Sequence, residues 1–172
     1  MTRIAFIMDE MFEDSEFRVP FDQLKDSGYE PVVIGLETGK KLEGKKGKET
    51  VVTDVSIDDV SPSEFDALVV PGGYSPDKIR GNPKMVEFTR SIFEAGKPLA
   101  AICHAGWMLA EADILRGKTV TSWPSIKTDL INAGGDWVDQ EVVEDGNLIT
   151  SKKPDDLNAF TKTLLSQIEQ RR

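Results

Sequence analysis

The chain has 172 residues, 30% of them charged, and a formal net charge of −9 at pH 7, which fits one soluble globular domain over residues 1–172. The negative charge argues against a nucleic-acid-binding surface, and no apolar run reaches the ~20 residues of a membrane span. One cysteine and one histidine exclude an internal disulfide and argue against structural zinc, so we expect a cytoplasmic protein with no metal and no cofactor.

The first half of the chain alternates short apolar runs with helical patterns. Buried strands are predicted at Arg3–Met8, Pro31–Gly35 and Ala67–Val70. Apolar residues at helical spacing predict a helix over residues 12–28, either kinked at Pro20 or starting late. Residues 37–60 favour β-structure with a hairpin near Lys45–Gly47, and we interpret the basic stretch 40–48 as a solvated loop.

The second half continues the alternation. Strands are predicted at Leu99–Ile102, Lys118–Ser122, Val138–Val143 and Asn147–Ser151, with a hairpin turn at Asp145–Gly146. Helices are predicted at Pro83–Ala95, from just after Cys103 to about Ala112, at Ser125–Ala133 and at Pro154–Glu169. Strands alternating with helices form βαβ units, so we predict an α/β fold, a doubly wound and mostly parallel sheet with helices on both faces.

Candidate reactive groups follow three of the predicted strands, at the carboxyl ends where open α/β sheets place their sites. The fourth core strand leads directly into Cys103 and a helix. Helix N–H groups favour a thiolate there, so we expect a reactive thiol with a pKa below the ~8.5 of free cysteine. A small buried core residue is the alternative interpretation of a lone cysteine at this position.

The other strand ends offer groups for proton transfer and anion binding. His104, the only histidine, is a candidate base beside the thiol. Gly72 and Gly73 free backbone N–H groups for an oxyanion, although the pair also fits a simple tight turn. Glu13 and Glu16 share a helical face, and one carboxyl beside a thiolate would hold a proton for donation; pairing with the helix dipole is the alternative.

Taken together, these residues make the sequence resemble the PfpI family, intracellular cysteine peptidase-like and deglycase-like proteins of the class I glutamine amidotransferase-like superfamily. The resemblance runs nearly end to end. It rests on Phe12–Asp14 with Glu16, Phe65–Gly73, Gly96–Pro98, Ala101–His104, Ile126–Lys127 with Asn132–Gly134, and Thr150–Ser151 with Pro154 and Asp156–Leu157. It implies a flavodoxin-like fold.

The resemblance also implies roles for individual residues. Cys103 matches the family nucleophile, Glu16 the carboxylate that contacts the thiol, and Gly73 with the His104 N–H the oxyanion donors. In PfpI-type peptidases the histidine forms a triad with an acidic residue of a neighbouring subunit, which implies a homodimer or hexamer here. That position is Asp77, where the family pattern has glutamate.

Two residues after the nucleophile depart from the family pattern, which usually continues Cys-His-Gly-Pro. Ala105 replaces the glycine and limits backbone freedom. Trp107 is positioned either to line the mouth of the pocket or to pack against a neighbouring helix. We therefore expect the thiol site to persist with an altered substrate preference.

The leading hypothesis is a cysteine-dependent hydrolase with deglycase- or glyoxalase-like chemistry on small dicarbonyls or on glycated protein and nucleotide substrates. Peptide hydrolysis ranks lower, because a peptidase needs a chamber built by oligomerisation. The first alternative is a non-enzymatic redox or stress sensor that uses an oxidisable Cys103. A holdase-like chaperone is the third hypothesis, for which the sequence offers no separate signal.

Overall fold

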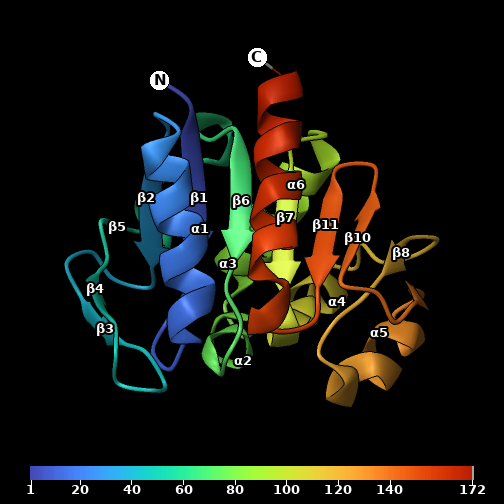
Figure 1. Ribbon diagram of the computed structural model, residues 1–172. Helices are drawn as coiled ribbons and strands as arrows, with labels where there is room; N and C mark the ends of the chain where they lie inside the picture. Colours follow the sequence, from blue (N-terminus) through green and yellow to red (C-terminus); the bar gives the residue numbers. More distant parts are fainter. Residues whose placement is uncertain (172) are drawn as a thin grey trace.

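The computed structural model describes residues 1–171 as helices packed on both faces of a seven-stranded sheet (Figure 1). The strand order is β10-β11-β7-β6-β1-β2-β5. The pairings in this sheet are parallel, except that β10 runs antiparallel to β11. The predicted α/β fold with a mostly parallel sheet is confirmed.

The main sheet contains β1 (Arg3–Ile7), β2 (Glu30–Gly35), β5 (Val55–Ser56), β6 (Ala67–Val70), β7 (Leu99–Ile102), β10 (Val142–Asp145) and β11 (Leu148–Ser151). Two smaller sheets pair β3 (Lys41–Glu43) with β4 (Thr50–Val52), and β8 (Thr119–Val120) with β9 (Asp136–Trp137). The helices are α1 (Asp14–Asp26), α2 (Ser75–Ile79), α3 (Pro83–Glu94), α4 (Gly106–Glu111), α5 (Lys127–Asn132) and α6 (Leu157–Gln170). Short 3₁₀ turns lie at Ile57–Asp59, Pro62–Glu64, Cys103–Ala105, Pro124–Ile126 and Pro154–Asp156.

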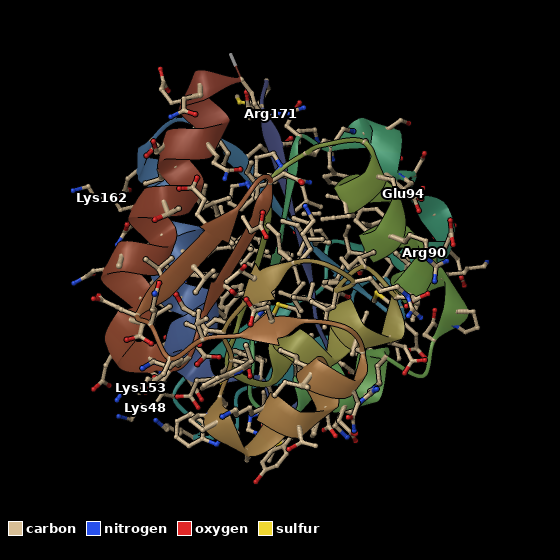
Figure 2. All side chains as sticks on the ribbon, turned by 90° about the vertical axis from the view of Figure 1, so that its right-hand side faces the viewer. Lys48, Arg90, Glu94, Lys153, Lys162 and Arg171 are labelled. Carbon is tan, nitrogen blue, oxygen red and sulfur yellow. The ribbon has the colours of Figure 1, made fainter. Side chains whose placement is uncertain are left out.

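Each face of the sheet has its own apolar core, because successive strand residues point to opposite faces. Phe17 of α1 and Phe160 of α6 are fully buried on one face, and Phe88 of α3 is buried on the other. Burying a side chain of this size contributes about 1.5–3 kcal/mol. Figure 1 shows α1 and α6 lying beside each other in front of the sheet. In Figure 2, Lys162 of α6 and Glu94 of α3 lie at opposite sides of the molecule.

The structure differs from the predicted elements in several places. The strand predicted at Val138–Val143 does not form as one element, because β9 ends at Trp137 and β10 begins at Val142. Helix α1 runs from Asp14 to Asp26 with Pro20 inside it, so the helix does not start late, and the kink stays a prediction. The predicted strand at Lys118–Ser122 shortens to β8 and pairs with β9 outside the main sheet. Helix α2 was not predicted, because its five residues are too few to show a helical repeat.

Three neighbouring strands bring the candidate groups to one edge of the sheet. Strand β6 lies between β1 and β7, so the chain segments after these three strands meet at their carboxyl ends. An antiparallel bridge joins Phe12 to Gly73, and the Tyr74 N–H donates to the Met11 carbonyl at 2.8 Å. Within residues 1–171, no helix combines the length and the apolar character that crossing a membrane requires.

Candidate active site

Cys103 sits on a strained turn between β7 and α4. Its φ is +63°, in the left-handed region that costs a residue with a side chain roughly 1–2 kcal/mol. Its side chain is 7% exposed, and the backbone N–H groups of His104 and Gly73 are directed at the sulfur. Backbone strain held at a nucleophilic residue is typical of a functional site rather than of a core cysteine.

Measurements of the free energy of unfolding test the backbone strain at Cys103. We expect Cys103→Gly to have a free energy of unfolding about 1 kcal/mol above that of Cys103→Ala, because glycine adopts positive φ without steric cost. Urea denaturation followed by circular dichroism measures the difference. Ala105→Gly is the matched control and should destabilise, since Ala105 has φ −62°. Equal stability of the two Cys103 variants would show that the turn is unstrained.

Glu16 is a fully buried carboxyl group that faces the same turn. Its Oε1 accepts the Gly72 N–H at 2.8 Å, and its Oε2 has no hydrogen-bond partner among the described residues. A side chain at Gly72 would approach the Cβ of Cys103 to 2.8 Å and the Glu16 carboxyl more closely still. Gly72 therefore has to lack a side chain for the thiol and the carboxyl to share this space, and the simple-turn interpretation is insufficient.

Glu16 and Cys103 ionise as a pair. Burial, and next the charge of Glu13, raise the pKa of Glu16 from 4.5 to about 8. Burial, and next the charge of Glu16, raise the pKa of the Cys103 thiol to about 12, against smaller effects of the His104 and Gly73 N–H groups. The expectation of a lowered thiol pKa is wrong here, because burial outweighs the helix N-terminus. At neutral pH the pair keeps at least one proton, so a base must assist the thiol.

Two lysines that sequence analysis assigned to a solvated loop cover the carboxyl groups instead. The predicted β3–β4 hairpin is confirmed, and its tip folds back over α1. Lys45 Nζ lies 2.9 Å from one Glu13 oxygen and Lys46 Nζ 2.8 Å from the other, and Glu13 is only 3% exposed. Asp14 anchors the tip by accepting N–H groups of Lys46, Lys48 and Glu49 at 2.8–2.9 Å.

Lys45 supplies the positive charge that acts on the site. Its ammonium lowers the pKa of Cys103, of Glu16 and of His104. We expect Lys45→Met to shift the pH profile of iodoacetamide labelling of Cys103 to higher pH and to slow labelling about fivefold at pH 7. Lys48→Met, an exposed change on the same loop, is the control. Identical profiles for Lys45→Met and the unmodified protein would rule out this electrostatic role.

His104 lies against the thiol, although adjacent residues usually point apart. Its Nδ1 is 3.3 Å from the Cys103 sulfur, and its Nε2 is 3.4 Å from Ser125 Oγ. Burial, and next the charge of Lys45, lower the pKa of His104, so the imidazole is neutral at pH 7 and free to accept a proton. The rings of Trp107 and Trp123 lie 5.1 and 6.4 Å from the imidazole.

The remaining predicted residues divide between the site and its surroundings. Trp107 is half-buried, and its Nε1–H donates to Asp129 at 2.9 Å, so it both flanks His104 and ties α4 to α5. Asp77 lies exposed on α2, and within residues 1–171 it makes no hydrogen bond or ion pair, so one chain does not complete the expected triad. Lys45 and Ser125 were missed, because each lies on a segment that only the folded chain brings to Cys103.

Comparison with known proteins supports a common ancestry over almost the whole chain. The profile of the DJ-1/PfpI family matches residues 2–167. Protein/nucleic acid deglycase 2 of Escherichia coli is 47% identical over 164 residues, which cover 95% of each chain. Deglycase PfpI of Pyrococcus furiosus is 42% identical over 167 residues, covering 97% of this chain and 99% of the relative. General stress protein 18 of Bacillus subtilis is 44% identical over 97% of this chain and 98% of its own.

Solved structures show the same fold. A two-domain protein of Anabaena variabilis with a DJ-1/ThiJ/PfpI-like and a ferritin-like domain superposes with a TM-score of 0.97 and 43% identity. The match covers 98% of this chain and 48% of that larger chain. DJ-1beta of Drosophila melanogaster superposes with a TM-score of 0.88 and 31% identity, over 97% of this chain and 90% of its own.

Proposed function

Because this chain belongs to the DJ-1/PfpI family, we propose that it is a cysteine-dependent hydrolase that removes dicarbonyl adducts from proteins and nucleotides and converts free dicarbonyls to hydroxy acids. One observation carries the proposal. A nucleophilic sulfur on a strained turn lies beside a buried carboxyl group that holds a proton up to about pH 8. That pair suits carbonyl chemistry, in which a nucleophile adds while a proton moves.

The first step is addition of the Cys103 sulfur to the aldehyde carbon. The S–H proton goes to His104 Nδ1, which lies 3.3 Å from the sulfur and is neutral at pH 7. A new C–S bond forms, the carbonyl π bond breaks, and the oxygen gains negative charge. The N–H groups of Gly73 and His104, directed at the sulfur in the resting site, are the donors that stabilise this oxyanion.

The second step moves a proton within the bound adduct. Glu16, which holds a proton at pH 7, first gives it to the oxyanion and becomes ionised. The ionised Glu16 then takes the hydrogen on the former aldehyde carbon, the electron pair forms a carbon–carbon double bond, and the neighbouring ketone oxygen takes the proton held by His104, which gives an enediol. Glu16 delivers its proton to the neighbouring carbon and takes back the proton of the first hydroxyl, leaving a thioester of a 2-hydroxy acid with Glu16 protonated and His104 neutral as at the start. Water cleaves the thioester and frees the thiol, so one dicarbonyl and one water give one hydroxy acid. For a glycated protein, the Cys103 sulfur forms a bond to the carbon that carries the adduct, the bond from this carbon to the amine, guanidine or thiol breaks, and the leaving group takes the thiol proton held by His104.

Peptide hydrolysis and redox sensing are the competing functions. Peptide hydrolysis would require a larger enclosed surface than one chain provides around Cys103. Redox sensing is favoured by the Glu16 Oε2 atom, which has no partner among the described residues and could donate its proton to an oxidised sulfur. Intact mass after peroxide titration, together with a dicarbonyl assay, distinguishes a sensor from the proposed hydrolase. A sensor stops reproducibly at one or two added oxygens and does not turn over dicarbonyls.

A substrate panel tests the proposed function. We expect the protein to consume methylglyoxal and the hemithioacetal of N-acetylcysteine, to release hydroxy acid stoichiometrically, and to leave unmodified peptides intact. Product is measured by nuclear magnetic resonance, so that simple trapping of the dicarbonyl is not counted as turnover. Loss of methylglyoxal limited to one equivalent per chain would show that the thiol is modified and not catalytic.

We further propose that residues 1–172 act as one cytoplasmic domain within a homodimer or hexamer. The match over residues 2–167 supports the single domain, and the exposed position of Asp77 supports an assembly. Asp77 would enter the site only from a neighbouring copy, where its carboxylate could face His104. Size-exclusion chromatography with light scattering measures the assembly, and a strict monomer would remove Asp77 from the mechanism.

A further inference from the structure

The ring of His104 is held at both of its nitrogens within one chain. Nδ1 faces the Cys103 sulfur at 3.3 Å, and Nε2 faces the hydroxyl oxygen of Ser125 at 3.4 Å. We propose that Ser125 is the positioning residue that keeps the Nε2 proton of His104 in place, so that the unprotonated Nδ1 meets the thiol. The catalytic consequence rests on the proposed function, whereas the geometry and its test do not.

The segment that carries Ser125 is fastened to the turn of Cys103. The Trp123 N–H donates to the Cys103 carbonyl at 3.2 Å, and the Trp123 ring lies nearly parallel to the imidazole at 27°. The Ser122 hydroxyl donates to the Trp123 carbonyl at 3.0 Å and accepts the Trp137 Nε1–H at 2.9 Å. These contacts fix the backbone on both sides of Trp123, so Ser125 is placed by the same turn that it serves.

The chemistry of a neutral imidazole requires such a partner. A neutral ring has one N–H and one lone pair. The Cys103 thiol keeps its proton at pH 7, so the lone pair belongs on Nδ1 and the ring proton on Nε2, where the Ser125 hydroxyl accepts it. With Ser125 Oγ accepting from Nε2–H, the lone pair on Nδ1 faces the thiol and can take its proton. After the transfer both nitrogens carry a proton, and the hydrogen bond from the cationic ring to Ser125 becomes stronger. Ser125 thus stabilises the state in which His104 holds the thiol proton.

Several charged groups lie around His104 and have to be kept constant. Lys45 from the β3–β4 loop lowers its pKa after the larger effect of burial, and the Cys103 thiol lies against Nδ1. Asp129 and Arg80 contact the ring of Trp107 that flanks the imidazole, and Asp77 lies on α2. Ser125 itself is uncharged and exposed, so replacing it changes none of these charges and does not threaten the fold. Replacing Ser125 by an uncharged residue therefore tests its contact with His104 alone.

The single histidine makes the proposal directly measurable by nuclear magnetic resonance. His104 gives one imidazole signal set, whose ¹⁵N shifts report the tautomer and whose pH dependence reports the pKa. We expect protonation at Nε2 in the unmodified protein, a lower His104 pKa in Ser125→Ala, a near-normal value in Ser125→Thr and a raised value in Ser125→Asp. Ser166→Ala, an exposed change on α6, is the control and should leave the titration unchanged.

Activity provides the second readout. At pH values above the His104 pKa we expect Ser125→Ala to lower kcat about fivefold with little change in KM, because fewer rings present an unprotonated Nδ1 to the thiol. The acidic limb of the profile should shift to lower pH in the same variant, and Ser125→Thr should restore both properties. A proton on Nδ1 in the unmodified protein, or a Ser125→Ala titration identical to that of the unmodified protein, would overturn the proposal. If dicarbonyls are not turned over at all, the proposed function fails, and the titration still decides the role of Ser125.

Discussion

Cys103→Ala is expected to abolish turnover of methylglyoxal and of glycated substrates, with a loss of more than ~10³-fold in kcat/KM. Alanine fills almost the same space but has no atom that can bond to the substrate carbon. Because the chain contains no second cysteine, no other thiol can replace the missing nucleophile. Hydroxy acid release, followed by nuclear magnetic resonance, measures the loss.

The fold has to be shown to survive this substitution. Cys103 is buried at the end of β7, and alanine removes one sulfur atom whose polar contacts are with His104 and the Gly73 N–H. The circular dichroism spectrum and the Tm of Cys103→Ala should therefore stay close to those of the unmodified protein. Cys103→Ser is the second variant, because it keeps a weak nucleophile in the same place. Activity within tenfold of normal in either variant would place the chemistry elsewhere.

Glu16→Gln is expected to lower kcat about 100-fold for the conversion of free dicarbonyls, where a proton must move between two carbons. The glutamine oxygen can still accept the Gly72 N–H, so the loss would report the missing exchangeable proton rather than a collapsed site. Iodoacetamide labelling should continue in this variant, because the sulfur is still present. Normal turnover by Glu16→Gln would remove Glu16 from the proton transfer.

The same substitution also has a pH-dependent effect on stability. The pKa of Glu16 is raised from 4.5 to about 8 in the fold, so between these values the folded chain holds a proton that the unfolded chain has lost. The stability of the unmodified protein therefore falls as pH rises through this window, whereas the stability of Glu16→Gln does not depend on this ionisation. The free energy of unfolding of Glu16→Gln, relative to that of the unmodified protein, should therefore rise by ~3 kcal/mol between pH 4.5 and 7.

Denaturation of both proteins at several pH values measures this difference. Glu94→Gln, an exposed change on α3, is the matched control and should show no such shift. The window stops below pH 8, since Cys103 ionises at still higher pH and would add its own contribution. A constant difference across pH 4.5–7 would mean that Glu16 is ionised in the folded protein at neutral pH.

Much of the fold could be predicted because its signals are local. The strands at Ala67–Val70 and Leu99–Ile102 are short, wholly apolar runs that need burial on both faces, and their boundaries are confirmed. Helix α2 and the pairing of β8 with β9 could not be predicted, because both are too short for periodicity and depend on neighbours distant in sequence. The course of α1 through Pro20 is likewise decided by packing, since propensity alone favours a break.

The candidate site was also predictable only in part. The positions of Cys103, Glu16 and Gly72 follow from strand ends, which a parallel sheet brings together whatever the rest of the chain does. The pKa of the thiol was predicted in the wrong direction, because sequence shows the helix N-terminus but not the depth of burial. Lys45 was missed for a related reason: only the folded hairpin carries its ammonium to the site.

The central claim is that the Cys103 sulfur bonds to the carbon of the dicarbonyl during each turnover. The most direct test is rapid quenching with acid during reaction with ¹³C-labelled methylglyoxal, followed by peptide mass spectrometry at low pH, where a thioester is preserved. The account predicts one labelled adduct on the peptide containing Cys103, which forms and decays as fast as hydroxy acid appears and is absent in Cys103→Ala. Label found only on lysine or arginine side chains, with product still released at the normal rate, would contradict it.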